Sequence, residues 1–107
     1  MSVEISRQIM SNIVNSVIVP ASAKVVFVDN TDTGIFNISG ISITEDTTNK
    51  VFKQTINLNF YLGANNTITK IEFYDASNTL ILIINTNTNI TAGDVYLTIT
   101  INYAYNF

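Results

Sequence analysis

Three features of this 107-residue sequence predict an all-β domain, an antiparallel β-sandwich or jelly roll. The stretch from Val95 to Phe107 is apolar or aromatic at every odd position and carries Thr or Asn at four even positions. A period of two over this length indicates a strand with one face on a core. Strand-like segments also recur roughly every ten residues, with short turns between them. No helical pattern follows residue 20, which favours a sandwich.

The composition favours a folded protein that associates with other proteins. Hydrophobic residues make up 47% of the chain, whereas charged residues make up 12%, about half the usual ~25%. The polar surface must therefore consist mostly of uncharged residues, and the chain contains 15 Asn and 14 Thr beside 17 Ile. Few charges oppose association. With five basic residues and a net charge of −3, we expect no nucleic-acid binding.

The residue types that most catalytic and metal sites need are absent. The chain has no Cys and no His, which excludes disulfides, thiol nucleophiles and the commonest general base and metal ligand. The turn from Asp29 to Gly34 partly matches a calcium loop, but Thr31 and Thr33 stand where acids are preferred. We therefore expect no enzyme activity, no cofactor and no metal.

Two absent segments bear on localisation. No apolar run of 18 residues exists, so we expect no membrane span. The first residues lack a basic region followed by an apolar one, so we expect no signal peptide and synthesis in the host cytoplasm.

Residues 1–20 are expected to form a helix or an assembly arm, ahead of a sandwich over residues 21–107. Ile5, Ile9 and Ile13 recur at four-residue spacing, which favours a helix over about residues 4–16. The same residues also share one strand parity, so an arm donated to a neighbouring subunit remains open. Pro20 ends the segment in either case.

Six strands are expected after Pro20, separated by turns rich in Asp, Asn and Gly. A glycine at a shift in the apolar pattern of the second strand, Gly40, suggests a bulge. Residues 85–89 are expected to form a polar loop rather than an edge of alternating Asn residues. The strands are Ala23–Val28, Ile35–Thr44, Val51–Leu62, Thr67–Tyr74, Leu80–Ile84 and the final stretch.

The fifth expected strand is apolar on both faces. Five consecutive Leu and Ile residues at an open sheet edge would favour aggregation. This strand is therefore either a central strand beneath the N-terminal segment or a surface covered by a neighbouring subunit. The candidate subunit interface comprises Ile5, Ile9, Ile13, Leu80, Ile81, Leu82, Ile83 and Ile84.

Aromatic residues separate by type between the two expected strand faces. Phe27, Phe52, Phe60 and Phe73 fall on apolar parities, whereas three tyrosines fall on polar ones. Outward tyrosines are either cross-strand partners or a contact surface. The candidate surface contacts are Tyr61, Tyr74, Tyr96 and Asn89.

The pattern of the last half of the chain resembles small virion and tail proteins of tailed phages. The resemblance covers about residues 51–107 and rests on four segments: Ile68–Ala76, Thr79–Leu82, Asn89–Asp94 and Leu97–Tyr103. It implies a structural subunit of a tail, fibre, spike or capsid surface, located in the virion and without catalytic residues. Its partners would be further copies of itself, as a trimer or higher oligomer, and other virion proteins.

Two other functions remain open. The first is a β-sandwich module that binds a receptor or a host-surface glycan through its tyrosines and the region of Asn89. The second is a subunit of a cellular filament joined by strand donation, against which the expected lack of a signal peptide counts.

Overall fold

The computed structural model describes residues 1–107 as an antiparallel all-β sandwich with one short helical segment, which confirms the predicted fold class. A jelly roll has eight strands, and this sandwich has seven. They are β1 Ser22–Phe27, β2 Phe36–Asn37, β3 Gly40–Asp46, β4 Val51–Leu62, β5 Asn66–Tyr74, β6 Leu80–Ile90 and β7 Gly93–Ala104.

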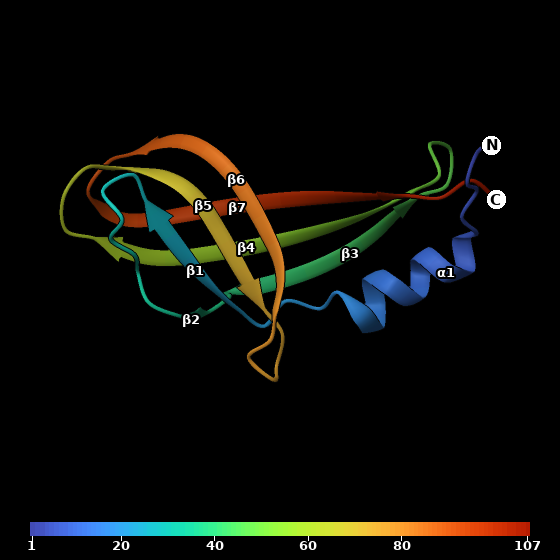
Figure 1. Ribbon diagram of the computed structural model, residues 1–107, viewed down its shortest axis with the longest axis horizontal. Helices are drawn as coiled ribbons and strands as arrows, with labels where there is room; N and C mark the ends of the chain where they lie inside the picture. The colour runs from blue at the N-terminus through green and yellow to red at the C-terminus, as the bar shows by residue number, and fades with distance from the viewer.

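The strands form two layers (Figure 1). The first sheet has the order β2-β1-β5-β6 and the second has the order β3-β4-β7, with every paired neighbour antiparallel. Consecutive pairs β1–β2, β3–β4 and β5–β6 stay within a sheet, whereas the connections β2–β3, β4–β5 and β6–β7 cross between sheets. Two of these three connections join edge strands: β2–β3 on one side of the sandwich and β6–β7 on the other.

The second sheet is longer than the first, and β4 forms its centre. Every second side chain of β4, from Phe52 through Ile56 to Phe60, is buried on one face. The first sheet covers only the half around Ile56, Leu58 and Phe60. The other half, around Phe52, is covered by the N-terminal helical segment. The molecule is therefore elongated, with extents of 47 × 26 × 25 Å.

The main core lies between the two sheets. Phe73 and Val25 are fully buried from the first sheet and pack with Ile56 and Leu58 from the second. All four phenylalanines expected to point inward do so, since none of their side chains is more than 9% exposed. The predicted inward parity of these strands is confirmed.

The N-terminal segment is helical, as α1 (Arg7–Asn12) followed by a π-helical turn, Ile13–Val17. The Ser6 hydroxyl caps its start by accepting a hydrogen bond from the Ile9 N–H at 3.2 Å. Neither helical piece has the length and apolar character that crossing a membrane would require.

The buried row of this helical segment differs from the predicted Ile5–Ile9–Ile13 stripe. Met10 and Val14 are buried, Ile5 and Ile13 flank them, and Ile9 is 56% exposed. Met10 and Val14 form one buried cluster with Phe52 and Tyr105, and the Arg7 guanidinium lies 5.4 Å from the ring centroid of the same Phe52.

Polar contacts hold the two chain ends together at this end of the molecule (Figure 1). Arg7 donates two hydrogen bonds of 2.7 Å to the Glu45 carboxylate, and the Tyr105 hydroxyl donates one of 2.6 Å. The backbone of Ile5 also bonds to Asn106 in both directions, at 2.8 and 2.7 Å. The bonds from Arg7 and Tyr105 lower the pKa of Glu45 to about 2.

A buried amide of β4 joins the end of the helical segment to β7. Gln54 is fully buried, and its Nε2 donates to the Ile18 carbonyl at 2.8 Å. Its Oε1 accepts from the Tyr103 hydroxyl at 2.9 Å. Because a buried amide without partners is costly, these bonds fix the exit of the helical segment against the sheet.

Two predicted elements differ from the structure. The expected strand Ile35–Thr44 is two strands in different sheets, because the chain crosses between layers at Ile38 and Ser39. Gly40 therefore begins β3 and does not form a bulge. The expected polar loop 85–89 is wrong, because β6 continues to Ile90 and these Asn residues lie in an edge strand.

We expect Val14→Ala to lower the free energy of unfolding by about 1.5–3 kcal/mol, because it removes two fully buried methyl groups. Chemical denaturation measures the change. Val17→Ala is the matched control, since Val17 is 57% exposed on the same segment and should change stability by less than about 0.5 kcal/mol. Equal effects would contradict docking through Met10 and Val14.

We expect Glu45 to stabilise the fold above pH 4.5 and to lose this effect as the pH falls through about 2, because folding depresses its pKa. Denaturation of the wild type and of Glu45→Gln at pH 6 and pH 2 should show a stability difference that shrinks at pH 2. Glu4→Gln, which removes an exposed carboxylate, is the control and should show no such trend. A pH-independent difference for Glu45→Gln would refute the assignment.

Candidate functional site

The side of the sandwich formed by β6 and β7 is the first candidate site. Each strand pairs with a neighbour on one side only, β6 with β5 and β7 with β4. The turn at Thr91 and Ala92 joins the two strands across the layers (Figure 1). Two adjacent strand edges, of 11 and 12 residues, therefore lack a backbone partner.

The strand Leu80–Ile84 lies in this uncovered edge, so the central-strand interpretation is wrong. The N-terminal segment covers the opposite end of the other sheet and not β6. None of the five residues is buried: Leu80 and Ile83 are 43% and 49% exposed, and the other three pack partly against the core. The apolar sequence Leu80–Ile84 correctly indicated that this strand has two apolar faces, but it did not indicate whether the strand lies at the centre or at the edge of its sheet.

An apolar groove of about 210 Å³ opens between these two edges. Ile68 and Ile71 of β5 form its base. Its walls are Ile84, Thr86 and Thr88 from β6 and Leu97, Thr98 and Ile99 from β7. Because neither edge is closed over it, part of the sandwich core is accessible from this side.

The two sides of the sandwich differ in how their edges are protected. On the side formed by β2 and β3, β2 has only two residues, and β3 ends in Glu45 and Asp46 beside the helical segment. Short edges and edge charges are the usual protection against strand pairing. On the side formed by β6 and β7, β6 has no charged residue and β7 has only Asp94. These two strands are long, and most of their length carries no charge that would oppose pairing with another strand.

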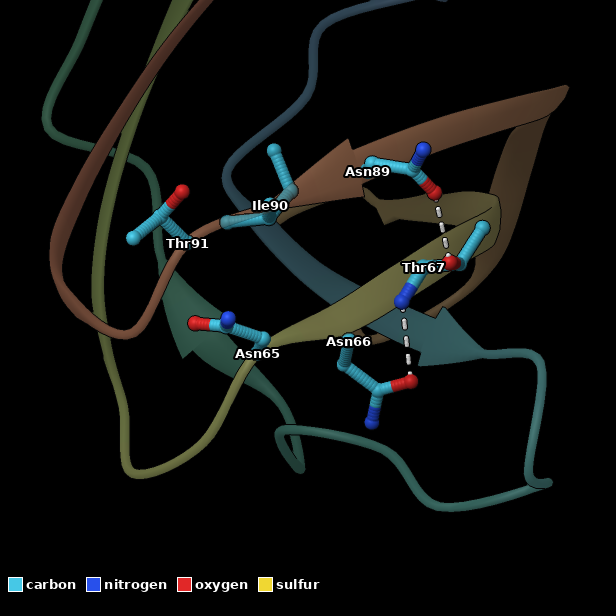
Figure 2. A pocket seen from close by; sticks show the side chains of 6 residues that line it. All are labelled: Asn65, Asn66, Thr67, Asn89, Ile90 and Thr91. Carbon is cyan, nitrogen blue, oxygen red and sulfur yellow. Dashed lines mark hydrogen bonds between the residues drawn. The ribbon is translucent and has the colours of Figure 1, made fainter.

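A second candidate site is a polar hollow of about 280 Å³ beside the start of β5 and the end of β6 (Figure 2). The pairing of these strands places Asn66 opposite Ile90 and Thr67 opposite Asn89. The Thr67 hydroxyl donates to Asn89 Oδ1 at 2.7 Å. The six lining residues are Asn65, Asn66, Thr67, Asn89, Ile90 and Thr91.

Hydrogen bonds fix the amides around this hollow. Asn65 Oδ1 accepts the Ala92 N–H at 2.8 Å, and Asn66 Nδ2 donates to Asp29 Oδ2 at 3.3 Å. The hydroxyl and N–H of Thr31, followed by Asn66, lower the pKa of Asp29. The hollow offers neutral donors and acceptors, the groups that bind hydroxyl-rich ligands.

The three outward tyrosines do not form one surface. Tyr61 and Tyr96 are 74% and 73% exposed on the outer face of the second sheet. Because Tyr61 pairs with Asp94 and Asn59 with Tyr96, the two rings are diagonal neighbours. Tyr74 is half-buried in the first sheet. Asn89 lies apart from both, in the polar hollow.

The structure separates the residues that the sequence grouped as one interface. Ile5, Ile9 and Ile13 belong to the helical cover, whereas Leu80–Ile84 belongs to the free edge. The groove was missed, because its lining comes from three strands that are distant in sequence. One signal was present: from Leu80 to Ala104 the only charged residue is Asp94.

No protein-family model, no curated protein and no solved structure matches this chain.

Proposed function

We propose that this protein is a structural subunit that assembles with copies of itself as part of a virion. The observation that carries the proposal is the side formed by β6 and β7. It combines two unpaired edges, an apolar groove and almost no charge. Such an edge templates pairing with another chain.

The energetics of this side favour association over exposure. Leu80 and Ile83 are about half exposed, and three further residues of the same edge are only partly buried. Covering one Leu or Ile fully contributes roughly 1.5–3 kcal/mol. Because a symmetric assembly repeats each contact in every subunit, a few such residues per subunit are enough.

The virion location and the absence of catalysis rest on the sequence. The strand pattern of residues 51–107 supports a location in a tail, fibre, spike or capsid surface, together with other virion proteins. The absence of His and Cys supports a role without chemistry. In this proposal the long, uncharged sheets are assembly surfaces.

We expect the purified protein to form ordered oligomers, a trimer or larger, because its free edges remain unsatisfied in a monomer. Light scattering gives the mass, and electron microscopy shows whether the assemblies are regular. A monomer at all accessible concentrations would refute the proposal. Mass spectrometry of virus particles from a host that carries the gene tests the virion location.

A glycan- or receptor-binding module is the second candidate function, favoured by the polar hollow. Five of its six lining residues are Asn or Thr. Tyr61 lies near the end of β4 and Tyr96 near the start of β7, and these strand ends connect to β5 and β6, which line the hollow. A glycan long enough to reach from the hollow to the outer face of the second sheet would meet amides that form hydrogen bonds and aromatic rings that offer an apolar platform.

We expect a glycan-binding role to show as retention on a panel of immobilised glycans, weakened at least tenfold by Asn89→Ala or Tyr96→Ala. Circular dichroism confirms that each variant remains folded. Asn49→Ala, in the β3–β4 turn at the other end of the molecule, is the control and should bind normally. Retention of no glycan, or equal loss in all three variants, would eliminate this function.

A further inference from the structure

We infer that β7 is an interface with a second copy of this chain, in which the two β7 edges pair antiparallel about a two-fold axis. The inference rests on the proposed function and names one of its contact surfaces: the two-fold contact joins subunits in pairs, and a trimer or larger assembly uses a further contact. The pairing would join the sheets into one of six strands, with β7 next to β7. The partner strand would also extend one wall of the apolar groove, since Leu97 and Ile99 line it.

The side-chain pattern of β7 is compatible with itself. An antiparallel pair centred on Ile99 places Leu97 opposite Ile101 on the core face and Thr98 opposite Thr100 on the outer face. Apolar residues thus meet apolar ones, and Thr–Thr pairs are favourable across strands. Nine residues, Val95–Tyr103, would then pair over about 30 Å.

The charges of β7 also permit this pairing. Asp94 is its only charged residue. In the arrangement centred on Ile99 it lies opposite Ala104 and not opposite a second acid. The outer-face neighbours of Thr98 and Thr100 on β4 are Asn57 and Thr55, which are uncharged, and the one charged neighbour along the paired stretch is Lys53, beside Asn102 and one strand away from the contact. No ionised group of β7 itself therefore has to be desolvated between Val95 and Tyr103.

Two other segments fit this edge less well. Two β6 strands paired over their full length would place Ile81–Ile84 opposite the Asn and Thr residues 86–89, which mismatches the two halves. The N-terminal segment of a neighbour, the other strand considered from the sequence, is held in its own subunit by Met10, Val14 and the Arg7–Glu45 ion pair.

The test introduces like charges at the edge without touching the core. Thr98→Lys/Thr100→Lys and Thr98→Glu/Thr100→Glu change exposed outer-face positions. In a β7–β7 pair each variant brings like charges together, so we expect at least a tenfold loss of self-association for either alone. Mixed one to one at low salt, the two should associate again, as measured by light scattering and sedimentation velocity.

The control places the same lysines on β3, the opposite edge of the same sheet. Ser42→Lys/Thr44→Lys lies on β3, on the same outer face, and should associate as the wild type does. Undiminished self-association of the Thr98/Thr100 lysine variant would overturn the inference. So would a mixture that stays monomeric, which would place another segment on this edge. A wild type that never self-associates refutes the proposed function itself, whereas ordered assembly by the lysine variant refutes only the β7 contact.

Discussion

The inward face of β4 sets the constraint on which the rest of the structure depends. It presents buried side chains from Phe52 to Phe60, over more length than the four-stranded sheet covers. A second cover is therefore required, and residues 5–18 provide it. Gln54 lies at the junction, and its two hydrogen bonds allow a polar group to remain where the covers meet.

Because the helical segment covers one half of β4, the side of the molecule formed by β6 and β7 has no cover. The helical segment occupies the end of the long sheet near β3, and its Arg7 pairs with Glu45 of that edge strand. It therefore cannot also shield β6, which lies in the other sheet. Leu80–Ile84 and the groove between β6 and β7 remain uncovered because the only helical element of the chain packs elsewhere.

The fold class, the strand parities and most turns were predictable, because alternation along a strand is a local property. Phe27, Phe52, Phe60 and Phe73 lie inward as expected. The sheet to which each strand belongs was not predictable. The apolar pattern shifts by one residue at Gly40, and a bulge within one strand or a crossing between the two sheets would produce the same shift. The position of Leu80–Ile84 at an edge also depends on pairing with β5 alone. The helix itself was favoured correctly, but its buried row, Met10 and Val14, packs against Phe52 and Tyr105, which are distant in sequence.

The side formed by β6 and β7 differs from the side formed by β2 and β3, and this difference is what self-assembly through β6 and β7 would require. The other side is partly protected, by the two-residue length of β2 and, at the end of β3, by Glu45, Asp46 and the helical segment. Asn and Thr supply the polarity of β6 and β7, as in the Thr98–Asn57 hydrogen bond. Such side chains exchange bonds with water for bonds across an interface at a low net cost, whereas charged groups resist desolvation. Lack of charge brings no free-energy gain to an edge that stays in water, but it lowers the desolvation cost of an edge that another copy covers.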